Sequence, residues 1–502
     1  MTCIKHDKEL NTMPKVIPNT IPNTRPNILF IFTDQHNASF MGCAGKDIVN
    51  TPNLDQLAKK GVMFHNAYCQ NPLCVPSRAS LITGRYCRNI GIYENRHILE
   101  SNSVTIPRVL SAAGYRTCVI GKTHFNGEQY QGYQQRPYGD IFGQAHQPDP
   151  IRKPENFEHG LGDLLENTGV SGIPLPLTQT EICVAETSKW LQGHIAMYSD
   201  KPFYLSVNFD KPHFPIRAPK KYYEKYAGKI QLPEFPPDYL EKDAVPFVRE
   251  AIKVNGGWEH YGKDVEMHER ALAAYYACIE WVDDAIGRIL ETLKYLGLSD
   301  NTVVIYSSDH GDMAGEKGAW QKTVFFDSSV KVPMIIRWPE HFKSNACIDE
   351  LVGLIDLFPT MCEIAEIETP EICDGISLVP ILEGRKDGFE RDAIFCESVV
   401  LKVPEHAGCM IRTCKWKYCY YIDNNEELYD MEQDSGEWNN LAENPEYDYI
   451  KSQLKARVIE FWKPEDQIDR YKSTPIMKNE KHFYHYSNQF ALSDGTIFDG
   501  RP

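Results

Sequence analysis

Hydrophobic and polar positions along this chain fall into short apolar runs separated by longer amphipathic stretches. Residues 27–33 (NILFIFT), 115–120, 203–209 (FYLSVNF) and 302–307 (TVVIYS) are continuous apolar runs, which are typical of strands buried on both faces of a parallel sheet. Helical patterns that end at glycine lie between them, the clearest at 268–296. The alternation predicts an α/β fold with a large mixed, mostly parallel sheet flanked by helices.

The pattern changes near residue 385. Short runs at 393–398, 409–413 and 417–422 predict antiparallel strands, and a helical pattern follows at 447–462. We therefore expect a smaller C-terminal α+β domain, an antiparallel sheet plus a helix. The predicted organisation is an N-terminal extension (1–25), a main domain (26–385), the small domain (386–465) and a C-terminal tail (466–502).

Three stretches show no firm periodicity. Residues 125–177 and 214–262 are rich in proline and tyrosine, and we expect long surface loops there. The aromatic stretch 482–490 (HFYHYSNQF) is unusual for a chain end. It leads to the hypothesis that the tail folds onto a pocket of its own or of a neighbouring subunit in a homo-oligomer.

Composition narrows the functional classes. The chain of 502 residues is 42% hydrophobic and carries a formal charge of −16, which argues against binding to nucleic acid or to an anionic membrane surface. Its 15 cysteines are dispersed without C-x-x-C pairs, as in reduced proteins. Residues 1–26 contain no apolar core of a signal peptide, and no apolar run is long enough for a membrane helix. We therefore expect a cytoplasmic protein.

Polar pairs follow four of the predicted strands, at the point where each strand ends. Parallel sheets bind ligands at the carboxyl ends of their strands, so neighbouring strands would bring these side chains into one crevice. The alternative is that each pair only caps its strand. The pairs are Asp34/Gln35, Lys122/His124, Lys211/His213 and Asp309/His310.

A short helical pattern begins at Cys74 and closes at Gly84. Pro76 suits a first helical turn, and Arg78 lies about one turn beyond Cys74, so the helix start is a place for an oxyanion. A single cysteine in such a position is more often a packed thiol. The full string C-x-P-S-R-x-S-L-x-T-G-R is more specific, because it resembles the signature of the type I sulfatases in the alkaline-phosphatase-like superfamily.

The resemblance implies an enzyme that hydrolyses sulfate monoesters, with 26–385 as its catalytic domain. In that family a maturation enzyme oxidises the signature cysteine, here Cys74, to Cα-formylglycine, and the hydrated aldehyde is the nucleophile. Arg78 would hold the aldehyde diol in its reactive pose. One hydroxyl attacks sulfur, and the second expels sulfate from the sulfo-enzyme, so no attacking water is needed.

The resemblance also implies one divalent cation, bound by Asp34, Gln35, Asp309 and His310. Oxygen donors with one imidazole suit Ca²⁺, which the family usually holds, and Mn²⁺ or Mg²⁺ would also be accepted. Many members have Asp-Asp where this chain has Asp34-Gln35. The alternative is therefore that Gln35 does not bind the metal and that its amide hydrogen-bonds to residues that do.

The remaining site residues are assigned by the same resemblance. Lys122 and Lys322 would grip sulfate oxygens. His213 would protonate the departing alkoxide, and His124 would deprotonate the second hydroxyl. Lys322 rests only on its spacing after Asp309.

The substrate is not determined by these motifs. The segments GYRTCVIGKTHFNG and QGYQQRPYGDI resemble choline sulfatases and are compatible with carbohydrate sulfatases, so a saccharide, choline or aryl sulfate is expected. Asp-Gln with Asp-His also resembles phosphonate monoester hydrolases and phosphodiesterases, which use the same aldehyde but tend to lack the G-K-x-H pair. A third possibility is an inactive metal-binding protein whose cysteine is never converted.

Overall fold

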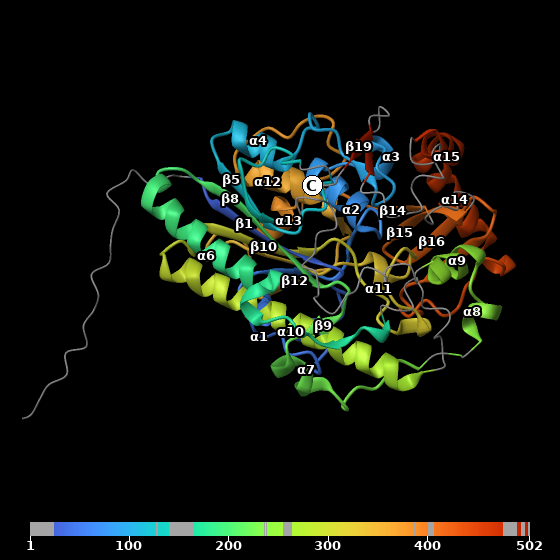
Figure 1. Ribbon diagram of the computed structural model, residues 1–502. Helices are drawn as coiled ribbons and strands as arrows, with labels where there is room; N and C mark the ends of the chain where they lie inside the picture. The colour runs from blue at the N-terminus through green and yellow to red at the C-terminus, as the bar shows by residue number, and fades with distance from the viewer. Residues whose placement is uncertain are drawn as a thin grey trace, which may run out of the picture.

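The computed structural model describes residues 25–126, 129–139, 165–234, 236, 238–254, 264–385, 387–399, 406–474, 489–492 and 497–499. Its main feature is an 8-stranded sheet of order β12-β2-β11-β10-β1-β8-β5-β6 (Figure 1). The strands are β12 (Ala346–Ile348), β2 (Val62–Phe64), β11 (Met334–Arg337), β10 (Thr302–Ser308), β1 (Asn27–Asp34), β8 (Phe203–Pro212), β5 (Arg116–Gly121) and β6 (Gln135–Gly139).

The sheet is mixed and mostly parallel, as predicted. β1 pairs in parallel with β10 and with β8, and β5 pairs in parallel with β8 and β6. The exception beside β10 is β11, which is antiparallel to both β10 and β2. The carboxyl ends of the four predicted apolar strands therefore lie at one edge of the sheet.

Helices cover both faces of the sheet (Figure 1). Ile28, Phe30 and Phe32 of β1 pack into a core with the helices on one face, whereas Leu29 and Ile31 pack into the core on the other face. This alternation explains why the strand is apolar at every position. The first face carries α2 (Cys74–Thr83), α4 (Ile106–Ala112) and α12 (Leu357–Ile364), and the second carries α1 (Pro52–Lys59), α6 (Gln179–Tyr198) and α10 (Val265–Tyr295).

The C-terminal region forms a second, antiparallel sheet of order β14-β15-β16-β17. Its strands are β14 (Ala393–Val399), β15 (Ala407–Thr413), β16 (Trp416–Tyr421) and β17 (Glu426–Asp430), and α14 (Asp448–Trp462) packs against it. The predicted antiparallel sheet plus helix is confirmed. β17 and α15 (Pro464–Ser473) were not predicted.

The two stretches expected to be surface loops contain regular structure. The first stretch, 125–177, contains β6, and residues 140–164 of that stretch lie outside the described part. The second contains α7 (Lys220–Tyr226), α8 (Tyr239–Lys242) and α9 (Pro246–Val254). Phe247 of α9 is buried and stacks on Phe325, with ring centroids 5.4 Å apart. The expectation of loops was therefore wrong for these segments, because prolines obscured short helices whose apolar residues are buried.

The other strands and α-helices of the described residues are short. They are β3 (Ala67–Tyr68), α3 (Cys87–Ile90), β4 (His97–Ile98), β7 (Gly169–Val170), β9 (Arg217–Ala218), α11 (Asp327–Val330), β13 (Val352–Gly353), α13 (Val379–Glu383), β18 (Gln489–Leu492) and β19 (Ile497–Asp499). β18 pairs in parallel with β4 of the same chain. Residues 482–488 of the aromatic stretch lie outside the described part, so the tail hypothesis stays a prediction.

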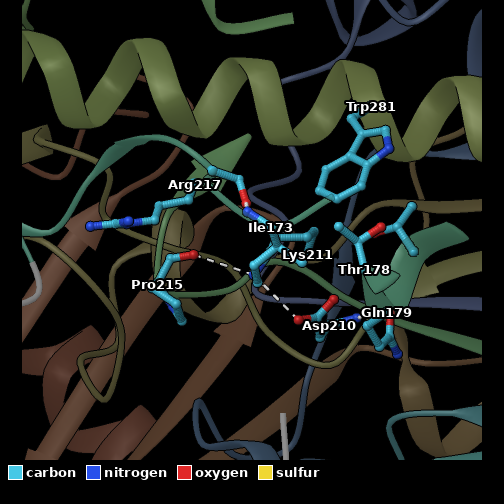
Figure 2. A pocket seen from close by; sticks show the side chains of 10 residues that line it. Ile173, Thr178, Gln179, Asp210, Lys211, Pro215, Arg217 and Trp281 are labelled. Carbon is cyan, nitrogen blue, oxygen red and sulfur yellow. Dashed lines mark hydrogen bonds and ion pairs between the residues drawn. The ribbon is translucent and has the colours of Figure 1, made fainter. Parts of the chain in front are cut away.

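Two features of this fold matter for function. The carboxyl end of β8 borders a cleft that also involves the first turn of α6 and Trp281 of α10 (Figure 2). The start of α2 lies against the same edge of the sheet, because Ser77 Oγ donates to the carbonyl of Asp309 at 2.5 Å. Within the described residues, no helix has the length and apolarity that a membrane span requires.

Candidate active site

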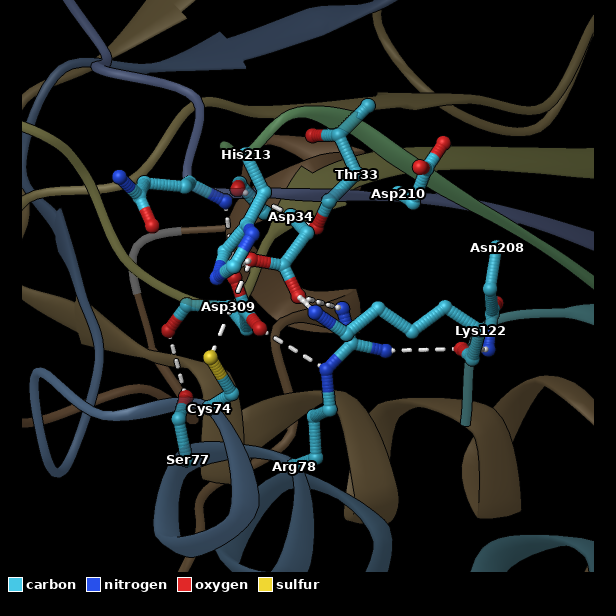
Figure 3. A network of polar contacts seen from close by, with 12 residues as sticks. Thr33, Asp34, Cys74, Ser77, Arg78, Lys122, Asn208, Asp210, His213 and Asp309 are labelled. Carbon is cyan, nitrogen blue, oxygen red and sulfur yellow. Dashed lines mark hydrogen bonds and ion pairs between the residues drawn. The ribbon is translucent and has the colours of Figure 1, made fainter. Parts of the chain in front are cut away.

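Most of the side chains expected at the strand ends meet around Cys74 (Figure 3). Lys211 was expected among them, but its ammonium group contacts Asp210 and the carbonyls of His213 and Pro215 instead. Asp34 ends β1, Lys122 follows β5, His213 follows β8, and Asp309 follows β10. All predicted site residues are buried, none more than 7% exposed. They are Asp34, Gln35, Cys74, Arg78, Lys122, His124, His213, Asp309, His310 and Lys322.

α2 places Cys74 at its first residue. Leu73 before it is extended, and Gly84 after the helix has φ 66°, the left-handed conformation that glycine adopts readily at a helix end. The backbone N–H of Val75, which has no partner within the helix, donates to Asn95 Oδ1 at 3.0 Å. Cys74 is therefore held at a capped, buried helix start.

The thiol of Cys74 touches groups from three other segments. Its Sγ lies 3.2 Å from His310 Nε2, 3.4 Å from Lys322 Nζ and 3.9 Å from Asp34 Oδ1. His124 also forms a hydrogen bond with this thiol. The structure thus surrounds Cys74 with two imidazoles, an ammonium group and a carboxylate.

Arg78 bridges the two carboxylates. Its Nη2 lies 3.0 Å from Asp34 Oδ2 and its Nε 2.8 Å from Asp309 Oδ2. Nη1 donates to the carbonyl of Lys122 at 2.9 Å. The planar guanidinium thereby fixes two strand ends and the turn after a third, and it leaves Oδ1 of Asp34 3.9 Å from the thiol.

The charges of the site stabilise one another. Lys122 Nζ lies 2.5 Å from Asp34 Oδ2. Burial would raise the pKa of Asp34, but Lys122, His213 and Arg78 hold it well below its ordinary value. Burial would lower the pKa of Lys122, and Asp34 raises it instead. Asp34 is therefore ionised, and Lys122 is protonated, at neutral pH.

One group of side chains has the geometry of a cation site. Single ligand atoms of Asp34, Cys74, Asp309 and His310 all lie within 4.8 Å of one another. Ligands at about 2.3–2.6 Å from one Ca²⁺ lie at such separations. His310 Nδ1 is 3.0 Å from the carbonyl of Gly311, so Nδ1 carries the proton and Nε2 presents its lone pair to the group. Burial lowers the pKa of His310 to about 4, which keeps the imidazole neutral.

Gln35 lies at the border of this group. Its Nε2 donates to Asp312 Oδ2, and its Oε1 accepts from Lys322 Nζ. The amide oxygen therefore contacts an ammonium group in this structure. Its backbone N–H donates to Asp309 Oδ1 at 3.0 Å, which keeps the residue beside the acidic cluster.

The two histidines flank the thiol from different segments. Burial lowers the pKa of His124, and its contact with Cys74 opposes that shift. His213 Nδ1 lies 2.7 Å from the carbonyl of Phe214, and its Nε2 lies 3.7 Å from Asp34 Oδ1. The carbonyl accepts the Nδ1 proton and so directs Nε2 toward the site.

Two further residues shape the site without being among the predicted site residues. Asn208 Nδ2 donates to the carbonyl of Lys122 at 2.8 Å; an amide inside the apolar run of β8 was the available signal. Asp312 Oδ1 accepts from the backbone N–H of Ala314 at 2.7 Å and of Gln321 at 3.0 Å. It therefore folds the loop that carries Lys322.

This fold and site define a hydrolase of the sulfatase class. The sequence profile of the sulfatase family matches residues 26–367, and the profile named N-sulphoglucosamine sulphohydrolase, C-terminal, matches residues 315–463. The chain belongs to the sulfatase family, whose members hydrolyse sulfuric ester bonds and whose norm is a formylglycine nucleophile with a divalent metal.

Individual relatives agree with this assignment. The chain is 32% identical to the choline-sulfatase of Rhizobium meliloti (strain 1021), over 84% of this chain and 83% of the relative. It is also 32% identical to the arylsulfatase of Clostridium perfringens (strain 13 / Type A), over 85% of this chain and 93% of the relative. The phosphonate monoester hydrolase of Agrobacterium radiobacter shares the fold, with a TM-score of 0.75 at 22% identity, covering 95% of this chain and 100% of that one.

Proposed function

We propose that Cys74, once converted to Cα-formylglycine, is the nucleophile of this sulfatase. The observation that carries the proposal is the contact of its Sγ with His310 at 3.2 Å and Lys322 at 3.4 Å, inside the cluster that also contains Asp34. A packed structural thiol would have apolar neighbours instead. Conversion requires a maturation enzyme and an oxidant, and because the thiol is 1% exposed, it precedes folding.

Asp34, Asp309 and His310 would hold one divalent cation, most naturally Ca²⁺, beside residue 74. Gln35 joins them if its amide turns from Lys322. The cation supplies positive charge for a sulfate oxygen and for the nucleophilic hydroxyl. The chain itself contributes three cations to this site, Arg78, Lys122 and Lys322.

Proton transfers are assigned to the two histidines. One hydroxyl of the hydrated aldehyde loses its proton to solvent and forms a bond to sulfur while the ester S–O bond breaks. Protonated His213 gives its Nε2 proton to the oxygen of the leaving alcohol. His124 then takes the proton of the second hydroxyl. The aldehyde C=O reforms and its bond to the sulfate oxygen breaks, which releases inorganic sulfate. Water rehydrates the aldehyde.

The proposed substrate is a small sulfate monoester of choline, a saccharide or an aryl alcohol. The relatives named above act on choline and aryl sulfates by their names, and a third is an N-acetylglucosamine-6-O-sulfatase. The phosphonate monoester hydrolase alternative is less favoured because Lys122 and His124 both face the centre of this site. We also propose the division into a catalytic domain (26–385) and a small domain (386–465).

Mass spectrometry of the peptide containing residue 74, combined with a sulfate-release assay, tests the proposal. We expect the aldehyde mass in active protein, and release from at least one of aryl, choline and saccharide sulfates. The kcat/KM for a sulfate monoester should exceed that for a phosphodiester. Full activity with an unmodified thiol, or a preference for the phosphodiester, would contradict the proposal.

A further inference from the structure

The loop that carries His213 borders a cleft through Pro215 (Figure 2). The cleft has a volume of ≈ 440 Å³, part of it open to solvent, and is lined by Asp210 and Lys211 from β8 and Thr180 from α6, among others. None of the roles assigned above uses these residues. Lys211 is 8% exposed, so its ammonium group is held by the protein and not by water.

Three oxygens surround the ammonium group of Lys211. Its Nζ lies 3.3 Å from the carbonyl of His213, 3.2 Å from the carbonyl of Pro215 and 3.2 Å from Asp210 Oδ2. A lysine ammonium has three N–H donors, so these contacts match its full capacity. Two of the three acceptors belong to the short loop around His213.

The contacts fix this loop on both sides of Phe214. Lys211 binds the carbonyls of His213 and Pro215, and the carbonyl of Phe214 lies between them in the chain. This Phe214 carbonyl accepts from His213 Nδ1 at 2.7 Å. Pro212 and Pro215 have no N–H, so this segment has few backbone donors with which to organise itself. The side chain of Lys211 therefore supplies donors where the backbone lacks them, and it sets the plane of the carbonyl that orients the imidazole.

Asp210 holds the ammonium group in place. Its Oδ2 pairs with Lys211, and its backbone N–H donates to Gln179 Oε1 at 3.3 Å. Gln179 Nε2 in turn donates to the carbonyl of Asn208 at 2.9 Å. The pair is thus anchored to the sheet and to α6 independently of the site charges around Asp34.

We propose that Lys211, fixed by Asp210, is a positioning residue for His213. It acts on the reaction by aiming Nε2 of His213 at the leaving oxygen, and it does not touch the substrate. The inference rests on the proposed function of His213 as general acid. A displacement of a catalytic group by about 1 Å costs on the order of 10²-fold in rate, and the loss should fall on steps that need the proton.

Leaving-group dependence is the test, with converted, metal-loaded enzyme. We expect Lys211→Met to lower kcat for an alkyl sulfate by about 10- to 100-fold and for 4-nitrophenyl sulfate by less than about threefold, with little change in KM, because nitrophenolate departs without protonation. Lys211→Arg should recover part of the loss. Lys220→Met is the matched control, since Lys220 is an exposed lysine that pairs with Glu224 on the same helix, and it should behave as wild type.

A double-mutant cycle separates this inference from the function on which it rests. His213→Ala should show the same leaving-group dependence, and adding Lys211→Met to it should cost nothing further. Equal losses on both substrates for Lys211→Met, or additivity in the double variant, would overturn the inference while leaving His213 in its role. If His213→Ala instead loses the same activity on the alkyl sulfate and on 4-nitrophenyl sulfate, His213 is not the general acid.

A second variant tests the same inference if Lys211→Met does not fold. Asp210→Asn keeps the side-chain shape and removes the anion that fixes the ammonium group. We expect the same selective loss on the alkyl sulfate, at smaller amplitude. A folded Asp210→Asn variant with unchanged kcat on both substrates would overturn the role of the pair.

Discussion

Replacement of Lys122 by methionine removes a buried cation from the centre of the site. Its Nζ lies 2.5 Å from Asp34 Oδ2, and the side chain is 1% exposed. The change removes one of the three cations of the site and leaves Arg78 and Lys322. A sulfate ester should therefore lose attraction in its ground state and in the transition state.

The size of the effect follows from simple electrostatics. A unit charge about 4 Å from a sulfate oxygen contributes ~4 kcal/mol at an effective dielectric constant of about 20. At about 1.4 kcal/mol per factor of ten, this corresponds to a loss of up to ~10³-fold in kcat/KM. Loss of one preorganised donor commonly costs about 10²- to 10³-fold in kcat, so we expect a decrease of kcat/KM within that range.

Stability should fall less than activity. Breaking a buried ion pair costs about 3–5 kcal/mol when one charge is left alone. Arg78 Nη2 also lies 3.0 Å from Oδ2 of Asp34, so the carboxylate keeps a partner. We expect a decrease of about 1–3 kcal/mol in the free energy of unfolding, below the usual cost of an orphaned buried charge.

The assay compares kcat/KM for 4-nitrophenyl sulfate, denaturant unfolding and the mass of the peptide containing residue 74. Lys220→Met, an exposed lysine on α7, is the control. The mass measurement ensures that a loss does not reflect missing conversion. A converted, folded Lys122→Met enzyme within threefold of wild type would refute the assignment of Lys122 to sulfate binding.

Three further predictions concern the metal and the buried charges. Chelation should abolish activity and addition of Ca²⁺ restore it, with the fold retained by circular dichroism, because Arg78 still pairs both carboxylates; activity that survives chelation would refute a required metal. Lys417→Met should destabilise the protein by about 3–5 kcal/mol in denaturant unfolding, because the buried Lys417 Nζ lies 2.5 Å from Asp327 and 2.6 Å from Glu437; a loss below about 1 kcal/mol would contradict this. Burial raises the pKa of Glu397 from 4.5 to about 7. The unfolded chain therefore loses this proton at lower pH than the folded protein does. As the pH rises from 4.5 to about 7, the free energy of unfolding should fall by roughly 3 kcal/mol. Glu397→Gln should reduce that fall in melting temperature between pH 5 and pH 8, whereas an unchanged profile would exclude Glu397 as its source.

Much of the sheet was predictable because burial on both faces leaves a simple pattern. β1, β8 and β10 are buried along their length and mostly apolar, and polar residues gather toward the end of each. β6 gave no such pattern, since the sequence QRPYG is only partly buried. Its extended shape depends on pairing with β5, in which Cys118 is opposite Gln135. Edge strands of this kind are specified by a neighbour and not by their own residues.

Parts of the site were hidden for a related reason. The sequence places Gln35 beside Asp34, but not the contacts of its amide with Asp312 and Lys322, which are 277 and 287 residues away. Asn208 looked like one polar residue in an apolar strand. Its role as a donor to the Lys122 carbonyl requires β8 to lie next to β5. The sequence motifs were enough to predict the reacting groups. The residues that orient those groups could not be predicted, because their contacts depend on which strands are neighbours in the sheet.

The central position of β1 explains how so many charges can share one buried site. β8 and β10 lie on the two sides of β1. Asp34 therefore contacts His213, which follows β8, His310, which follows β10, and Arg78 of α2. Oδ2 of each carboxylate is matched by Arg78, whereas Oδ1 of Asp34 lies 3.9 Å from Cys74 Sγ and Oδ1 of Asp309 accepts from the backbone N–H groups of Gln35 and His310. Such a cluster is costly to bury unless every charge has a partner. The pairing of strand ends therefore both stabilises the fold and leaves ligand atoms on the side where sulfate chemistry is proposed.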